Sequence, residues 1–278
     1  MLTRTSRFAF VAILSLAPIG VASAADLTPY VPDFSEESPA FADEWVISTT
    51  PYFWMTFYDG TMTVKGQTVD LTGTNVFDLL DAGDIRFPPL TNYLEARRGR
   101  WGGYLDTTFI GLNFGNDFSL GAGPATGALD LDFTYILINA GVIYTAAEWA
   151  MGNGTAALDL MGGVRYTYYD IDLNATIGGL PVDLAATLDW WDLTLGGRLR
   201  GEFDGGWFWN VRGDIAGADL ESDFSAQAIA TFGRDFQLGR LDMAWLVGYR
   251  FLYQDWSDGT DAVDLITHGP LVGLSFKF

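Results

Sequence analysis

The two-residue alternation of apolar and polar side chains that follows Glu44 constrains the fold of this chain more than any other feature. In the segment 239–254, Leu241 and every second residue after it are apolar or aromatic, whereas the positions between them, apart from Leu246 and Leu252, are polar or small. Because successive strand side chains point to opposite faces, this pattern predicts a strand with one apolar face. The same pattern predicts ten strands, at 45–58, 89–98, 100–115, 127–147, 155–173, 182–203, 206–217, 223–234, 239–254 and 264–278.

An export segment precedes these strands. Residues 1–24 predict a secretory signal peptide, because Arg4 and Arg7 come before the apolar run FAFVAILSL and small residues come before Ala25. Residues 25–43 are rich in proline, serine and acidic residues without periodicity, and they predict a flexible periplasmic tail. The remainder, 44–278, is expected to be a single domain because no linker divides it.

The export segment and the composition decide which strand face is expected to lie inside. In a soluble β-sandwich, which is the alternative, the apolar face would form the core. Here 49% of the residues are hydrophobic, 15% are aromatic and 33 are glycine, in a chain without cysteine. This combination favours an all-β, transmembrane, up-and-down antiparallel β-barrel in the outer membrane, with apolar side chains towards lipid and polar ones towards a lumen. About ten strands are expected, and eight or twelve stay open.

The expected partners follow from the same composition. Outer-membrane lipid and lipopolysaccharide should surround an apolar belt. The formal net charge of −20 argues against nucleic acid as a partner. The absence of cysteine excludes disulfides and thiolate metal sites. We expect no cofactor, and the sequence does not indicate an oligomeric state.

The connections between the strands differ in length. Three short segments predict periplasmic turns, at 98–100, 202–206 and 233–240. Five others predict outer connections, at 59–88, 116–126, 174–181, 218–222 and 255–263. In the first of these, TNVFDLLDA (74–82) predicts a short helical turn that either enters the barrel mouth or lies on its rim. Pro51 and Pro270 fall within expected strands and predict a bulge or a frayed end there.

The C-terminal segment GPLVGLSFKF alternates up to the last residue, and it places Phe276 and Phe278 on the lipid face. It resembles the terminal strand of bacterial outer-membrane proteins. That resemblance implies that Phe276 and Phe278 form a signal recognised by the barrel-assembly machinery.

A second resemblance covers roughly residues 45–106. It rests on PYFWM (51–55), on Asp59-Gly60, on VDLTGTNVFDLLD (69–81) and on LEARRGRWGGYLD (94–106). In these stretches the chain resembles a family of uncharacterised proteobacterial outer-membrane proteins. The resemblance implies an export signal and a barrel, and it assigns no functional residue.

Catalytic and metal-binding patterns are weak in this sequence. The single histidine, His268, is not part of an Asp-x-His motif, and Ser275 lies on the opposite strand face, so we expect no enzymatic activity. In DWSDGTDAVD (255–264) the acidic residues are three apart, which is not the EF-hand pattern. We expect a solvated acidic loop there rather than a Ca²⁺ site.

The alternation places twelve charged residues of both signs on the lumen face: Glu95, Arg97, Asp106, Asp159, Arg165, Arg198, Arg200, Glu202, Arg212, Asp214, Asp242 and Arg250. In a narrow barrel such charges should pair across the lumen. Two functional interpretations follow. The network either fills and stiffens a non-enzymatic barrel with a structural or surface-interaction role, or it lines a narrow porin-like channel for small solutes.

Overall fold

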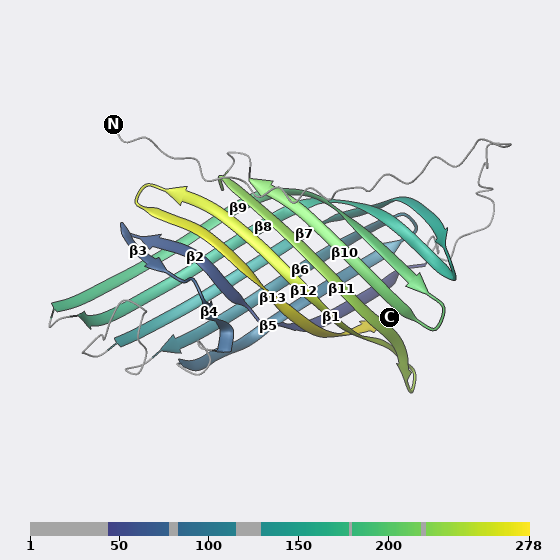
Figure 1. Cartoon of the computed structure of the whole chain (residues 1–278), viewed down its shortest axis with the longest axis horizontal. Helices are drawn as coiled ribbons and strands as arrows, with labels where there is room; N and C mark the ends of the chain where they lie inside the picture. The colour runs from purple at the N-terminus through teal and green to yellow at the C-terminus, as the bar shows by residue number, and fades with distance from the viewer. Residues whose placement is uncertain (1–43, 78–82, 115–128, 178–179, 218–220) are drawn as a thin grey trace, which may run out of the picture. The chain divides into compact units, whose positions relative to one another are not determined.

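The computed structural model of the chain describes residues 44–77, 83–114, 129–177, 180–217 and 221–278 (Figure 1). The predicted signal peptide, 1–24, and the predicted tail, 25–43, lie outside the described residues, so both stay predictions. Within the described ranges, no helix has the length and apolar character needed to cross a membrane.

The described strands close into an antiparallel barrel. Strand β1 (Val46–Trp54) pairs on one side with β5 (Gly83–Arg98) and on the other with β13 (Asp261–Lys277). Between β5 and β13, each strand pairs with the next in chain order: β6 (Trp101–Phe114), β7 (Leu129–Met151), β8 (Gly154–Ile177), β9 (Leu180–Phe203), β10 (Trp207–Gly217), β11 (Phe224–Leu238) and β12 (Leu241–Asp258). Strand β2 (Phe57–Val64) continues β1 along the same neighbour, β13. Counting β1 and β2 as one, the described residues form ten barrel strands, which confirms the predicted fold class.

The two ends of the barrel have different connections. At one end, which we call the turn end, the strands are joined by the short turns 99–100, 152–153, 204–206 and 239–240, and the chain ends nearby at Phe278. At the other, the loop end, β2 pairs with two short strands, β3 (Gln67–Asp70) and β4 (Thr74–Asn75). The predicted helical turn is replaced at its start by β4. Val76 and Phe77 have helical geometry, and 78–82 lie outside the described residues.

Several strands are longer than the alternation predicted. Strands β7, β8 and β9 have 23, 24 and 24 residues, as the long teal ribbons of Figure 1 show. The predicted connections 59–88 and 255–263 are wrong over most of their length, because both are largely strand, and so is the predicted turn 233–240, where β11 continues to Leu238. A tilted strand crosses the hydrocarbon layer with about 9–11 residues. The longest strands therefore extend well past it, because their hydrogen-bond ladders continue to be satisfied by neighbouring strands.

Burial alternates along the strands and identifies the two faces. Leu195 on β9 is 71% exposed and its neighbour Leu193 is also exposed, whereas Arg250 on β12 is fully buried. Large apolar side chains thus lie on the outside of a closed barrel and charges lie inside, which is the reverse of a soluble sandwich. Such an outer surface is stable only in lipid, so the protein is a transmembrane barrel of the outer-membrane type.

The two prolines lie on the strand pair that closes the barrel. In the β1–β13 ladder, direct pairing is interrupted between Thr49 and Tyr52, where Pro51 lies, and again beyond Trp54, opposite Pro270. The register is the same on both sides of each interruption, so the predicted bulge or frayed end is wrong. Proline lacks an N–H group and removes a ladder bond without shifting the strand. A bond from Thr50 Oγ1 to Ser275 Oγ, 2.9 Å long, bridges the first interruption.

We expect Gly269→Ala to destabilise this closing pair. Gly269 has a φ of 153°, and a Cβ atom there would lie 1.8 Å from the carbonyl oxygen of Met55. The variant should lose more than about 1 kcal/mol of unfolding free energy, because alanine fits neither the conformation nor the space. The measurement is the temperature at which the compact, SDS-resistant band disappears on gels.

Gly103→Ala is the matched control, since a Cβ atom at that position would meet its nearest neighbour at 3.6 Å. Equal melting temperatures for the two variants would contradict the close approach of β1 and β13.

Candidate functional site

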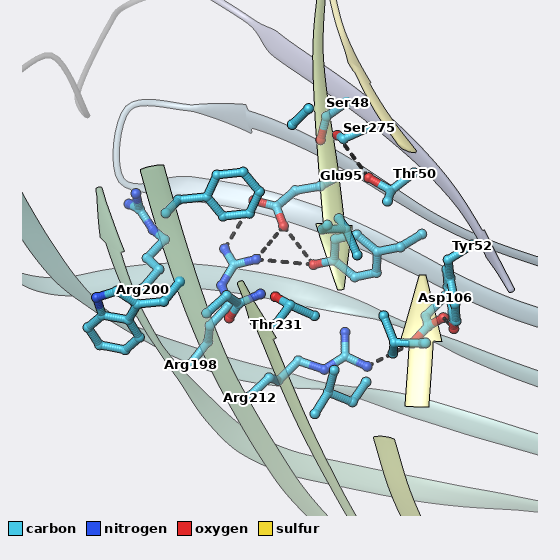
Figure 2. Close-up of a pocket in the computed structure, with 18 of the residues that line it drawn as sticks. Ser48, Thr50, Tyr52, Glu95, Asp106, Arg198, Arg200, Arg212, Thr231 and Ser275 are labelled. Atoms are coloured by element: carbon cyan, nitrogen blue, oxygen red, sulfur yellow. Dashed lines mark hydrogen bonds and ion pairs between the residues drawn. The ribbon is translucent and has the colours of Figure 1, made fainter. Parts of the chain in front are cut away.

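The lumen near the turn end contains a network of charged side chains centred on Asp159. Arg198 on β9 donates Nη1 and Nη2 to Glu95 Oε2 and Oε1, at 2.6 and 3.0 Å (Figure 2). Its Nε donates to Asp159 Oδ2 at 2.9 Å. Arg97 and Arg200 also bond Asp159, at 3.1 and 3.2 Å. Asp159 and Arg198 are direct cross-strand neighbours, whereas Glu95 lies on β5, three strands further round. The Arg198–Glu95 bond therefore crosses the lumen and ties its two sides together.

A second network is centred on Asp106 of β6. Its carboxylate accepts a bond of 2.7 Å from Arg212 Nη2 of β10 and another of 2.7 Å from the Tyr52 hydroxyl. Arg250 of β12 lies 3.7 Å from the same carboxylate. Arg250 also donates to Tyr52 Oη at 2.6 Å and to Gln227 Oε1 at 2.6 Å. Since Asp106 and its partners belong to separate strands, this network also spans the lumen.

Arg165 extends the second network towards β11. Its guanidinium pairs with Asp214 and donates to Asn139 Oδ1 at 2.7 Å and to Ser225 Oγ at 2.6 Å. Asp214 in turn accepts a bond of 3.0 Å from Gln227 Nε2, which joins the two parts. Arg165 is fully buried, so all of its bonds are made within the protein.

The structure brings ten of the twelve predicted lumen residues into ion pairs: Glu95, Arg97, Asp106, Asp159, Arg165, Arg198, Arg200, Arg212, Asp214 and Arg250. The other two lie at the turn end and are exposed. Glu202 lines the mouth of a cavity described below, and Asp242 accepts a bond from Gln237 at 2.7 Å. Neither joins the networks.

Sequence reasoning missed Glu148 and the two lumen tyrosines. A register shift between Thr145 and Ala147 reverses the alternation of β7, and it turns Glu148 inward to within 3.9 Å of Arg200. Alternation alone carries no signal for such a shift. Tyr52 and Tyr93 share the inward parity of their strands, and the Tyr93 hydroxyl donates to Glu95 at 2.6 Å.

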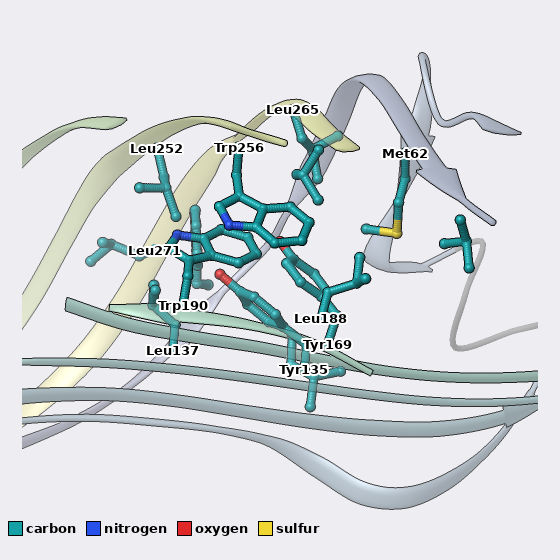
Figure 3. Close-up of a cluster of buried hydrophobic side chains, with 14 residues drawn as sticks. Met62, Tyr135, Leu137, Tyr169, Leu188, Trp190, Leu252, Trp256, Leu265 and Leu271 are labelled. Carbon is teal, nitrogen blue, oxygen red and sulfur yellow. The ribbon is translucent and has the colours of Figure 1, made fainter. Parts of the chain in front are cut away.

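Nearer the loop end, the lumen is filled by aromatic rings, which we call the aromatic plug: Trp54, Tyr135, Tyr169, Trp190 and Trp256 (Figure 3). The rings of Trp190 and Trp256 stack with centroids 4.9 Å apart and planes 11° apart, and those of Tyr135 and Tyr169 lie 4.8 Å apart. Buried aliphatic side chains surround them, including Leu137, Leu188, Leu252, Val263 and Leu265. The alternation predicted a polar lumen face, so this aromatic layer was not predicted, although Leu252 already broke the pattern.

Water does not reach the centre of either layer. Trp190 is 1% exposed and Leu252 is 0% exposed, and in the charged layer Arg250 is also at 0%. Side chains that lined a continuous aqueous channel would be accessible to water. The centre of the lumen is therefore packed with buried rings on one side and paired charges on the other.

A cavity of about 230 Å³ occupies the lumen between the charged layer and the turn end, and we call it the vestibule (Figure 2). Glu202 and Lys277 line it near the turn end, and Arg212, Asp106 and Leu271 line it more deeply. Leu271 also belongs to the buried cluster around the aromatic plug, so the vestibule ends where the plug begins.

His268 lies on the outer face of β13, as predicted. Its Nδ1 is 2.5 Å from the Tyr249 hydroxyl, and its Nε2 is 3.0 Å from Asp59 Oδ2. The ring also stacks on Phe57, with centroids 5.8 Å apart. Ser275 points inward to Thr50, so these two residues do not meet.

The predicted acidic loop is a hairpin. Asp255 and Asp258 lie on β12 and face Asp264 and Asp261 on β13. In the described part of the chain, no group of three or more potential metal ligands is placed to hold an ion.

No protein-family model matches this sequence, and no curated protein matches it. The chain is similar in structure to a FadL homologue of Pseudomonas aeruginosa, with 10% identity, a TM-score of 0.32, and coverage of 86% of this chain and 91% of the other. It is also similar to Ail, the attachment invasion locus protein of Yersinia pestis, with 12% identity, a TM-score of 0.31, and 85% and 99% coverage. A third is the Pseudomonas putida toluene transporter TodX, with 12% identity, a TM-score of 0.30, and 86% and 91% coverage. The assignment as a membrane barrel rests on the chain's own closure and outer surface, and the family resemblance stays a prediction.

We expect Arg198→Ala to destabilise the barrel strongly, because it removes the most buried guanidinium that pairs with both Glu95 and Asp159 and leaves only the partly exposed Arg97 between them. Breaking a buried pair costs about 3–5 kcal/mol. Arg200→Ala is the control, because Arg200 bonds the same Asp159 from a more exposed position, where about 0–1 kcal/mol is typical. Urea unfolding of both variants in lipid vesicles measures the two losses of unfolding free energy. Equal losses would show that the Arg198–Glu95 bond across the lumen adds no more stability than the Arg200–Asp159 pair.

Proposed function

We propose that the protein is a non-enzymatic outer-membrane barrel, closed to solutes, with a structural or surface-interaction role. The observation that carries this proposal is the packing of the lumen. Arg250 of the charged layer and Trp190 and Leu252 of the plug region have at most 1% exposure.

Physical reasons favour a filled lumen over a conducting one. A selective pore needs a wetted path whose side chains compete with the hydration of the solute. Here the lumen arginines already form ion pairs with Glu95, Asp106, Asp159 and Asp214. Barrels of about eight strands are just wide enough for side chains to fill, and this barrel has two more. The charge pairs then join opposite walls and stiffen the barrel.

The surface role is supported by the long strands at the loop end. Along β8 the outward positions are aromatic at Tyr166 and Tyr168 and then carry exposed carboxylates at Asp170 and Asp172. This change marks the upper edge of the lipid-facing belt, and the strand continues beyond it to Ile177. Since short turns face the periplasm in such barrels, the extension would face the cell exterior. Its acidic surface suits contact with divalent cations bridged to lipopolysaccharide phosphates.

A narrow channel is the second candidate, and the vestibule is the observation that favours it. A cavity of about 230 Å³ already occupies part of the lumen. Conduction would require the aromatic plug to move aside.

Conductance in planar bilayers separates the two candidates. The wild-type protein should stay at background, because the plug blocks the lumen. The double variant Trp190→Ala, Trp256→Ala should give measurable conductance, since it removes two stacked indoles from the block.

Trp191→Ala is the matched control, because Trp191 is adjacent in sequence but faces outward. It should leave conductance at background. Steady single-channel currents from the wild-type protein would contradict the closed barrel.

We also propose that the last strand is the assembly signal, with the barrel-assembly machinery as the partner that reads it. Phe278 is exposed on the outer face, and its backbone exchanges hydrogen bonds with Ile47 at 2.8 and 3.2 Å. Phe276 pairs with Thr49 across the same junction. The proposed signal would therefore lie on the strand pair that closes the barrel.

Phe278→Asp should reduce the amount of folded protein in the outer membrane several-fold while leaving export intact, because it removes the terminal aromatic group. Phe278→Tyr keeps the ring and should assemble normally. Quantifying the SDS-resistant band in outer-membrane fractions tests this, and normal levels of the Asp variant would refute the proposed signal.

A further inference from the structure

A shallow depression lies on the outer face of the barrel at the turn end, and we call it the turn-end groove. The described residues that line it include two arginines, Arg98 and Arg100, and none of them is acidic. Glu44, which comes shortly before β1, is exposed but does not line the groove. In a chain with a formal net charge of −20, the groove is a local patch of positive charge.

A tight turn brings the two arginines to the same end of the groove. Arg98 is the last residue of β5 and pairs with Trp101, the first residue of β6. Gly99, with a φ of 59°, is the first residue of the two-residue turn between them, where glycine is favoured. Arg100 donates Nη1 to the carbonyl oxygen of Thr145 at 3.2 Å, which holds its side chain against β7. This bond uses one of the five N–H donors of the guanidinium.

Two exposed indoles flank these arginines. Trp45 is 60% exposed and Trp101 is 62% exposed, and both line the groove. Trp45 precedes β1 and Trp101 begins β6, so the two rings stand on either side of β5, which carries Arg98. Tryptophan side chains of membrane proteins gather at the boundary between hydrocarbon and water. The arginines therefore lie at the level of the lipid headgroups.

The part of the groove towards the hydrocarbon is apolar and low. Gly103 pairs with Ala96 of β5 on one side and with Val142 of β7 on the other. A Cβ atom at Gly103 would have no neighbour closer than 3.6 Å, so the space above this glycine is open. Val142 is 58% exposed and borders the space, and Leu105 continues the apolar surface towards the centre of the lipid belt. A hydrocarbon chain fits this strip.

The other exposed arginine of the turn end lies in a different setting. The guanidinium carbon of Arg234 lies 5.2 Å from the ring centroid of Trp207, and its Nε donates to the carbonyl oxygen of Gly205 at 3.2 Å. Two carboxylates, those of Asp235 and Asp242, line the neighbouring surface. An anion would be repelled there, whereas the turn-end groove presents only positive charge.

We propose that the turn-end groove binds one anionic phospholipid, whose phosphate accepts hydrogen bonds from Arg98 and Arg100 and whose acyl chain lies along Gly103 and Val142. Guanidinium groups match the oxygens of a phosphate, and basic side chains at a membrane surface attract anionic lipids. A zwitterionic lipid also carries an ammonium group, which no described carboxylate of the groove would accept. With the turn end towards the periplasm, as proposed above, this lipid belongs to the periplasmic leaflet.

Native mass spectrometry of the folded, detergent-solubilised protein tests this proposal by lipid titration. Dioleoyl-phosphatidylglycerol is the probe, and dioleoyl-phosphatidylethanolamine is the zwitterionic counterpart with the same acyl chains. The first phosphatidylglycerol should bind at least ten-fold more tightly, and equal affinities would overturn the proposal. The titration in detergent is independent of membrane orientation and of conductance, so its failure would leave the proposed closed barrel untouched.

Glycerol 3-phosphate distinguishes a lipid site from a site for free phosphate esters. It carries the phosphate without acyl chains, so it should not displace bound phosphatidylglycerol at equal concentration. Displacement would show that the apolar strip contributes nothing, and it would overturn the assignment of a lipid.

Two double variants locate the headgroup. Arg98→Gln combined with Arg100→Gln should weaken phosphatidylglycerol binding at least ten-fold and leave phosphatidylethanolamine binding unchanged. Arg234→Gln combined with Arg240→Gln is the matched control, because it removes the same charge from the same end of the barrel. This control should keep the preference for phosphatidylglycerol. Equal losses in the two double variants would indicate a general effect of net charge and would contradict a specific site.

Gly103→Leu tests the apolar strip while keeping both arginines. The leucine side chain would fill the space above Gly103, so phosphatidylglycerol should bind several-fold more weakly. The SDS-resistant band confirms that the variant is folded. Unchanged affinity in this variant would overturn the assignment, even if the Arg98 and Arg100 double variant fails to fold.

Discussion

The whole structure depends on the hydrogen bonding of the backbone in a medium that offers none. In hydrocarbon every exposed N–H and C=O group costs several kcal/mol, so a sheet that crosses the membrane must have no edge. Here the requirement is met where β1 pairs with β13. This pair tolerates two prolines, because each removes one ladder bond without changing the register. Closure then forces each strand to have one face towards lipid and one towards the lumen.

The narrow lumen imposes a second constraint, which the protein meets in two ways. Towards the turn end, charges of opposite sign bond across the lumen, as Arg198 does with Glu95. Towards the loop end, stacked rings such as those of Trp190 and Trp256 fill the lumen with apolar surface. The two solutions have different consequences. Rings pack without a charge balance, whereas buried charges need partners of opposite sign, which the lumen carboxylates supply to the arginines.

Much of the architecture was predictable from local pattern. Strand positions, the outward face and the short turns at 99–100 and 204–206 follow from alternation and glycine-rich breaks. Strand ends at the loop end were not predictable, because beyond the lipid belt the outer face becomes polar and the alternation loses contrast. The hairpin at Asp258 and Asp261 looks like an acidic loop in the sequence, although its backbone remains paired. Likewise Glu148 was missed because a single register shift reverses the parity of a strand.

The sequence by itself determined that this chain forms a lipid-facing barrel with charges inside, because strand periodicity is a local property of the covalent chain. Only the tertiary structure decided which charges meet. Glu95 and Arg198 are 103 residues apart, and their bond depends on the curvature and register of the intervening strands. The burial of the aromatic plug also depends on the tertiary structure, and so does the lack of a hydrogen-bond partner at Arg212 Nε. Both are fixed by which side chains meet when opposite walls of a closed barrel come together.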